Sequence, residues 1–182
     1  RVIHLKKPSY WIDLKASQKS STTHTLNGVM SEDGKINGTI TSYSSGFDAL
    51  YLRKSIKKYS SVDEYVEKLD ERLSNIKIKK FKISNLDTVE NSMTEEYEVE
   101  FSVGNGEQSG SYFNPFFINP IRKNPFKLNE RNYPVDLGAA SEERISINIA
   151  LPEKYKVKEK PIDVSIALPN QGGKYLVRTD VS

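Results

Sequence analysis

Apolar and polar residues alternate with a period of two along several stretches of this 182-residue chain. Large aliphatic residues occupy every second position in 145–151 and in 162–168, and apolar residues alternate with glutamates in 96–101. A period of two places one set of side chains on one face of a β-strand. Because strands covered on both faces read as continuous apolar runs, this alternation predicts antiparallel strands that are each buried on one face only.

Two turn sequences predict hairpins. Asp33-Gly34 lies between the segments 24–30 and 35–43, and Asn170-Gln171-Gly172-Gly173 lies between 162–169 and 174–181. Asp-Gly favours a tight turn because glycine adopts a positive φ without strain. We therefore expect strands on both sides of each turn.

One amphipathic helix is expected at about residues 61–74. Its apolar stripe follows helical spacing, and Ser61 with Glu64 forms a capping box that marks its first turn. The preceding segment, 47–59, is predicted to be a shorter helix or a turn. In 76–83 the apolar pattern changes face between Ile78 and Phe81, which indicates a β-bulge. The stripe consists of Val62, Tyr65, Val66, Leu69 and Leu73.

These elements predict a mainly β (α+β) fold, an antiparallel β-sandwich-like domain with one packed amphipathic helix. We expect residues 1–21 to be a leading segment that continues from an upstream domain, since Arg1 is neither an initiator Met nor the start of a signal peptide. Residues 22–182 are expected to form a single domain. Trp11 and the aromatic rings of 112–133 are expected to close its core.

The composition limits the chemistry that this chain can perform. It contains no Cys, which excludes disulfides, thiolate metal sites and cysteine nucleophiles, and its two His argue against a multi-histidine metal site. We therefore predict no cofactor and no metal site. The net charge is only +3, and acidic residues in 63–71 separate the basic clusters 53–58 and 77–82, which argues against nucleic-acid binding. No apolar run reaches the roughly 18 residues of a membrane span.

A hydrolase would have to use His4 or His24, with a nucleophile from Ser20 or Ser21. The chain has no Gly-x-Ser-x-Gly sequence that would expose such a serine at a sharp turn. Neighbouring carboxylates on a strand point to opposite faces, so they do not form a glycosidase pair. Both histidines are therefore interpreted as surface or core residues, and a hydrolase built on His24 stays as an alternative.

The segment 112–136 is rich in proline and in aromatic residues. Proline excludes the interior of a helix or of a central strand, so we expect an ordered segment along the edge of the sheet. The rings either cover the core or form an exposed platform for a sugar or a protein. The candidate binding surface consists of Phe113, Phe116, Phe117, Phe126 and Tyr133.

Several short series occur in a fixed order along the chain, and together they resemble the C-terminal region of large bacterial transglutaminase-like proteins. These proteins have an N-terminal β-rich domain of unknown function, a papain-like transglutaminase core and a C-terminal β-domain of unknown function. The segment 124–136 is the most specific part of the resemblance. The series are Arg1-Val2-Ile3, Trp11-Ile12-Asp13-Leu14, Gly38-Thr39-Ile40, Asp48-Ala49-Leu50-Tyr51-Leu52-Arg53, Asn124-Pro125-Phe126-Lys127, Glu130-Arg131-Asn132-Tyr133-Pro134-Val135-Asp136 and Leu168-Pro169-Asn170.

The resemblance implies that the catalytic Cys–His–Asp set lies upstream, and no position of this chain matches it. The expected function is that of a non-catalytic accessory domain, which docks on the upstream transglutaminase-like core of the same polypeptide or binds a protein or a polysaccharide. A periplasmic, cell-surface or secreted location is implied by the resemblance alone. The alternative is a stand-alone carbohydrate- or protein-binding β-sandwich module.

Overall fold

The computed structural model describes residues 10–11, 19–73, 76–102, 130 and 139–181. The chain divides into two compact units, Arg1–Ala150 and Leu151–Ser182, and each is described by itself. The prediction of one domain over 22–182 stays a prediction.

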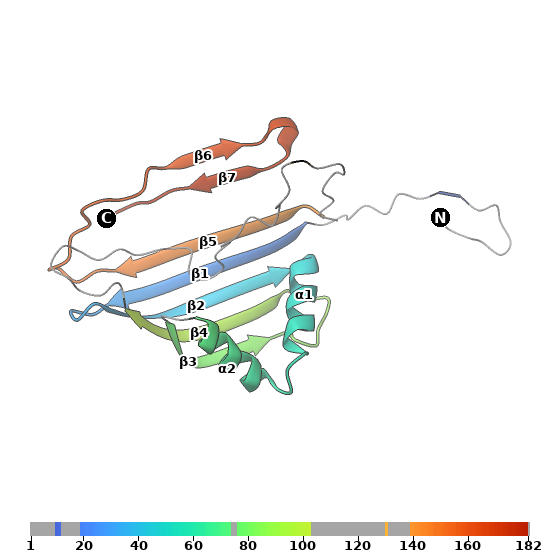
Figure 1. The fold of residues 1–182 in the computed structure, drawn as a ribbon, viewed down its shortest axis with the longest axis horizontal. Coiled ribbons are helices and arrows are strands. Elements are labelled where there is room, and N and C mark those ends of the chain that lie inside the picture. Colours follow the sequence, from blue (N-terminus) through green and yellow to red (C-terminus); the bar gives the residue numbers. More distant parts are fainter. Residues whose placement is uncertain (1–9, 12–18, 74–75, 103–129, 131–138, 182) are drawn as a thin grey trace. The chain divides into compact units, whose positions relative to one another are not determined.

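The first unit is built on a five-stranded sheet in the order β3-β4-β2-β1-β5, with two helices (Figure 1). Every neighbouring pair of strands is antiparallel except β1 and β5, which are parallel. Along the chain the elements are β1 (Ser20–Met30), β2 (Lys35–Ser45), α1 (Gly46–Ile56), α2 (Val62–Arg72), β3 (Ile76–Ser84), β4 (Met93–Ser102) and β5 (Ser141–Ala150).

The predicted β-rich α+β fold is confirmed, but the sheet is mixed rather than wholly antiparallel. The difference lies in β5, which pairs with β1 over Ser20–Val29. Alternation reports which face of a strand is buried and carries no information on strand direction. A parallel pair needs a long connection, and the 110 positions that separate β1 from β5 (31–140) provide one.

Local signals account for the first hairpin. Gly34 has φ 83° between β1 and β2, and the amide of Ser31 donates to the carbonyl of Lys35 over 2.7 Å. The predicted bulge is also confirmed, because the register between β3 and β4 shifts between Ile78 and Lys80.

The predicted amphipathic helix is α2, and its cap differs from a simple capping box. The hydroxyl of Ser61 accepts a hydrogen bond from the amide of Glu64 over 3.1 Å, as expected. The Glu64 carboxylate, however, accepts from the amide of Ser60 over 2.7 Å instead of from Ser61. The preceding segment also forms a helix, α1, which begins directly after β2 through Gly46 at φ 62°.

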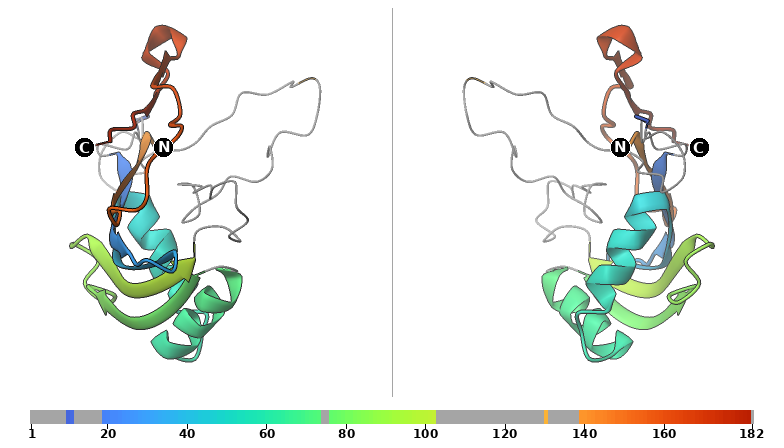
Figure 2. Two further views of the ribbon diagram at one scale, coloured as in Figure 1. Left: turned by 90° about the vertical axis from the view of Figure 1, so that its left-hand side faces the viewer. Right: turned by 90° about the vertical axis from the view of Figure 1, so that its right-hand side faces the viewer.

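Both helices lie on one face of the sheet and contribute to one core (Figures 1 and 2). The sequence prediction for Trp11 is wrong, because this side chain is 83% exposed and closes no core. The rings of 112–133 lie outside the described residues. The buried core consists of Leu26, Ile36, Ile40, Ala49, Ile56, Tyr65, Val66, Ile76, Met93, Tyr97, Val99 and Phe101.

The second unit contains the other predicted hairpin, formed by β6 (Val164–Ala167) and β7 (Lys174–Val177). The turn between them includes a short 3-10 helix, η2 (Pro169–Gln171), in which Asn170 has φ 54°. The expectation that this strand buries its apolar face is wrong, since Ile166 is 54% exposed and Ile162 is 87% exposed. A two-stranded hairpin has no second layer of its own to cover these side chains.

Candidate functional site

The helix-bearing face of the sheet is apolar at one end and polar at the other. The change occurs along β1, where Leu26 is fully buried in the core and the preceding inward positions are polar. We call this region the polar end of the sheet. Its inward residues are Ser20, Thr22 and His24 on β1, Ser42 and Ser44 on β2, and Glu143 on β5.

His24 and Ser42 are direct neighbours across the β1–β2 ladder. Nδ1 of the imidazole lies 2.7 Å from the Ser42 hydroxyl oxygen, and Nε2 lies 3.9 Å from a carboxylate oxygen of Glu143. A hydroxyl, an imidazole and a carboxylate therefore follow one another across three adjacent strands. The sequence had pointed to Ser20 or Ser21 as partners of a histidine, and only the strand register reveals Ser42.

Burial sets the protonation of this group. It lowers the pKa of His24, and the nearby Glu143 carboxylate opposes this effect by raising it. Since burial has the larger influence, the neutral imidazole is favoured. In the neutral ring, Nδ1 donates a hydrogen bond to the Ser42 hydroxyl in one tautomer and accepts one from it in the other.

The trio fits a structural contact between strands better than a nucleophilic centre. Ser42 is only 4% exposed, and it lies on β2, which is paired with β1 on one side and β4 on the other. Backbone amides in a strand paired on both sides are occupied by the ladder, so they do not supply the donors that would stabilise an oxyanion. A substrate carbonyl would also need access to the hydroxyl.

A shallow hollow of about 250 Å³ lies beside this trio, lined by Thr22, Asp48, Ser141, Glu142 and Glu143. Thr22 donates to the carboxylate of Asp48 over 3.1 Å, which links β1 to the first turn of α1. Among the described residues, no three His, Asp or Glu side chains converge in a way that could hold a metal ion.

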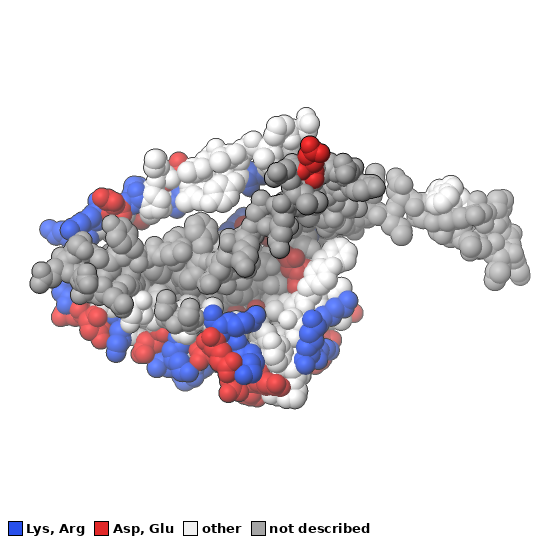
Figure 3. Space-filling view, in the orientation of Figure 1, with Lys and Arg blue, Asp and Glu red and all other residues white. Residues whose placement is uncertain are grey.

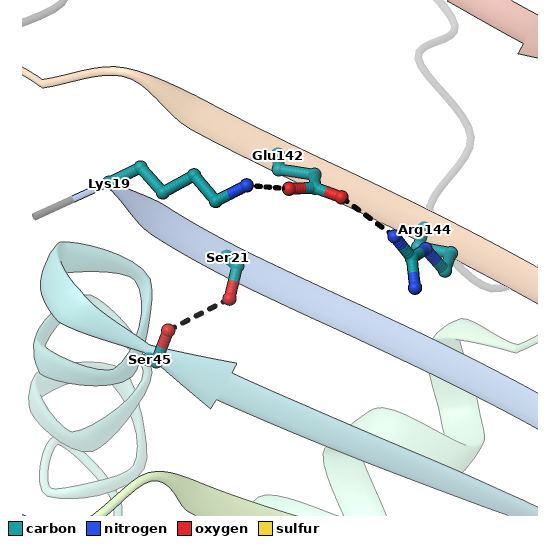
Figure 4. A network of polar contacts seen from close by, with 5 residues as sticks. All are labelled: Lys19, Ser21, Ser45, Glu142 and Arg144. Carbon is teal, nitrogen blue, oxygen red and sulfur yellow. Dashed lines mark hydrogen bonds and ion pairs between the residues drawn. The ribbon is translucent and has the colours of Figure 1, made fainter.

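The Glu142 carboxylate at this hollow is held by two cations (Figure 4). It accepts from the Lys19 ammonium and, over 3.0 Å, from the Arg144 guanidinium. The hydrogen bond and charge of Lys19 lower the pKa of Glu142 most. On the same side of the sheet, the hydroxyls of Ser21 and Ser45 lie 2.8 Å apart. These contacts tie β5, β1 and β2 together at their edge.

A second buried polar cluster surrounds Glu95 on β4. The phenol of Tyr65 donates to its carboxylate over 3.0 Å, and the phenol of Tyr97 donates to the same oxygen over 2.7 Å. Burial raises the pKa of Glu95, and it also raises the pKa values of both phenols. This cluster joins α2 to the sheet, and the alternation in 96–101 gives no sign of it.

Arg53 on α1 is 5% exposed, and its guanidinium binds backbone carbonyls rather than a carboxylate. It donates to Asn85 over 2.9 Å, to Thr88 over 2.8 Å and to Asn91 over 2.7 Å. The loop between β3 and β4 is thereby fastened to α1. Arg53 belongs to the basic cluster 53–58 in the sequence, and the structure places its side chain in the interior.

Most other basic residues on β3 and its surroundings are paired. Lys77 contacts Asp70 over 2.6 Å, and Lys80 contacts Glu98 over 3.0 Å. Figure 3 shows acidic and basic side chains interspersed over this part of the surface. The predicted binding surface of Phe113, Phe116, Phe117, Phe126 and Tyr133 lies outside the described residues, as does His4. Among the described residues, no helix is long and apolar enough to span a membrane.

Residues 109–181 match a family model, DUF3858, described as a "Domain of Unknown Function with solved-structure structure". The matched residues include β5, β6 and β7, whereas β1–β4 and both helices precede them. Comparison with curated proteins and with solved structures gave no match for this chain.

Proposed function

We propose that this chain is a non-catalytic accessory domain that works through its surface, as the C-terminal module of a transglutaminase-like protein outside the cytoplasm. Its partner in this proposal is the catalytic core of the same polypeptide. The single observation that carries the proposal is a contrast in exposure between two kinds of side chain. The best candidate nucleophile, Ser42, is buried in the sheet, whereas large aromatic side chains lie on the surface of the same unit.

The resemblance supports the assignment to a transglutaminase-like parent. Its most specific segment, 124–136, lies inside the residues that match a domain of unknown function. Three positions of the resembling series also meet structural demands. Ala49 and Arg53 are buried on α1, and a Cβ on Gly38 would lie 2.5 Å from the backbone oxygen of Asn27. These three residues stabilise the fold and carry no reactive group, which agrees with a domain that acts through its surface.

The experiment has two steps. The reading frame that precedes Arg1 is examined first for a papain-like core with its Cys, His and Asp. The purified core is then titrated with the separately purified chain in a calorimeter. We expect saturable binding with one chain per core.

Three outcomes would contradict the proposal. They are a reading frame without such a core, a core that gives no binding signal, and ester hydrolysis by the isolated chain that disappears in Ser42→Ala. A chain that binds polysaccharide but not the core would favour the stand-alone binding module instead.

A further inference from the structure

Helix α1 buries a charged residue and exposes two aromatic residues. Arg53 is 5% exposed, whereas Phe47 is 47% exposed and Tyr51 is 65% exposed. A surface helix ordinarily does the reverse, with its apolar stripe on the core and its charges in water. An exposed aromatic pair on a helix that hides its arginine is therefore informative about function.

The exposed residues form one stripe. Phe47, Tyr51, Lys54 and Lys58 follow one another at i, i+4, i+7 and i+11, which places them on the same side of a helix. We call them the α1 outer stripe, and its last member lies just beyond the helix end at Ile56. The buried residues Ala49 and Ile56 lie on the opposite side. Figure 3 shows uncharged and basic atoms next to each other over α1.

The two lysines of the stripe are available for an outside carboxylate. Among the described residues, neither Lys54 nor Lys58 has a carboxylate partner, while the adjacent Lys57 is paired with Asp87 at 2.8 Å. The stripe therefore combines apolar rings with two lysines that have no carboxylate partner in the described part of the chain. Complementary charges around an apolar centre are typical of specific protein interfaces.

The stripe is also rigidly placed. Arg53 fastens the inner side of α1 to the loop after β3 through three carbonyl groups, and Thr22 binds Asp48 in the first turn. A binding surface that is already ordered loses less conformational entropy when a partner docks.

We propose that the α1 outer stripe is a docking surface for a protein segment that presents an apolar side chain flanked by carboxylates. This inference rests on the proposed function, for which it supplies the surface and the chemistry of the partner. A nucleic acid is the poorer match. Two lysines provide little charge for a phosphate backbone, and acidic residues such as Asp63 and Glu67 on α2 follow closely in the chain.

The test uses a probe of defined chemistry, a random copolymer of glutamate and tyrosine, titrated against the full chain at low salt. We expect saturable binding that weakens about tenfold in Tyr51→Ala, as for an aromatic residue at the centre of an interface. The double variant Lys54→Glu/Lys58→Glu should lose binding and should instead bind a copolymer of lysine and tyrosine. Because all three positions are exposed, the thermal midpoint of each variant should match that of the parent chain.

The matched control is Lys156→Glu/Lys158→Glu, which makes the same change of charge at exposed positions in the second unit. It should bind the glutamate–tyrosine copolymer as the parent does. Equal losses in this control, or equal binding of heparin and single-stranded DNA, would overturn the inference in favour of unspecific attraction of polyanions.

If the chain binds the transglutaminase-like core but Tyr51→Ala binds it equally well, the inference fails and the proposed function stands. If the copolymer binds through the stripe but the core does not bind, the proposed function fails instead.

Discussion

The imidazole Nδ1 of His24 lies 2.7 Å from the hydroxyl of Ser42, its direct neighbour across the β1–β2 ladder. Ser42 is buried and His24 is half-buried, at the end of a sheet face that also carries the hydrophobic core. The hydrogen bond gives the His24 imidazole and the Ser42 hydroxyl a partner at a position where water has little access. Its consequences are therefore expected in stability and in its dependence on pH.

We predict that His24 makes the chain less stable in mild acid. Its pKa in the folded state is lowered below 6.5, so the unfolded state takes up a proton first as the pH falls. The contribution to the free energy of unfolding is thus complete above pH 6.5 and is lost as the pH falls through the folded-state value. His24→Asn should remove this part of the pH dependence in urea unfolding measured at about pH 7.5 and 5.5. If the variant keeps the full slope of the parent while His4→Asn loses it, the assignment to His24 is wrong.

The buried carboxylate of Glu95 should have the opposite effect. Its pKa is raised, so the unfolded state releases its proton first as the pH rises. The stabilising contribution is present below about pH 4.5 and is lost as the pH rises through the folded-state value. Glu95→Gln retains an oxygen for the Tyr65 and Tyr97 hydroxyls without the charge, and it should raise the free energy of unfolding at pH 8 by on the order of 1 kcal/mol. At pH 4.5 the gain should be smaller.

Glu96→Gln is the control for this prediction, because the neighbouring side chain is exposed. It should change the free energy of unfolding little at either pH. A Glu95→Gln variant that is less stable than the parent at pH 8 would show that the ionised carboxylate stabilises the cluster.

Arg53→Met should destabilise the chain by about 2–4 kcal/mol, because the hydrogen bonds from a buried, charged guanidinium to three backbone carbonyl groups would be lost. Chemical unfolding monitored by circular dichroism measures this loss. Lys54→Met changes the same charge at the adjacent exposed position and should cost less than about 0.5 kcal/mol. Equal stabilities of the two variants would mean that the carbonyl contacts of Arg53 contribute nothing.

Gly38→Ala should destabilise the sheet by roughly 1–3 kcal/mol, because the added methyl group overpacks the β1–β2 contact. A Cβ at this position would lie 2.5 Å from the backbone oxygen of Asn27 and 2.9 Å from the Cα of Gly28. Backbone atoms cannot rotate away as a side chain can. Thr39→Ala, on the other face of β2, is the comparison, and a thermal midpoint for Gly38→Ala at or above that of Thr39→Ala would contradict the prediction.

Local chemistry accounts for what the sequence predicts well. The Asp33-Gly34 turn, the Ser61 cap and the bulge after Ile78 each depend on residues that are close together in the chain, and each is present. The parallel pairing of β1 with β5 depends on residues more than 100 positions apart, so alternation within one strand cannot reveal it.

The candidate site was harder to predict for the same reason. Ser42 becomes the partner of His24 only through the register of β1 and β2, and Glu143 joins them only through the parallel strand. Arg53 lies in a run of basic residues that favours exposure, and its burial follows from carbonyl groups of a distant loop. Trp11 illustrates the converse error, since a large aromatic residue predicts a core position only if a packed layer surrounds it.

The central claim is that this chain acts through contact at the surface of α1 and not through the Ser42–His24 pair. The most direct measurement is the affinity of the full chain for the transglutaminase-like core, compared between the parent chain, Tyr51→Ala and Ser42→Ala. We predict that the parent and Ser42→Ala bind with the same dissociation constant and that Tyr51→Ala binds about tenfold more weakly. Binding that is lost in Ser42→Ala and unchanged in Tyr51→Ala, in chains with equal thermal midpoints, would contradict the claim.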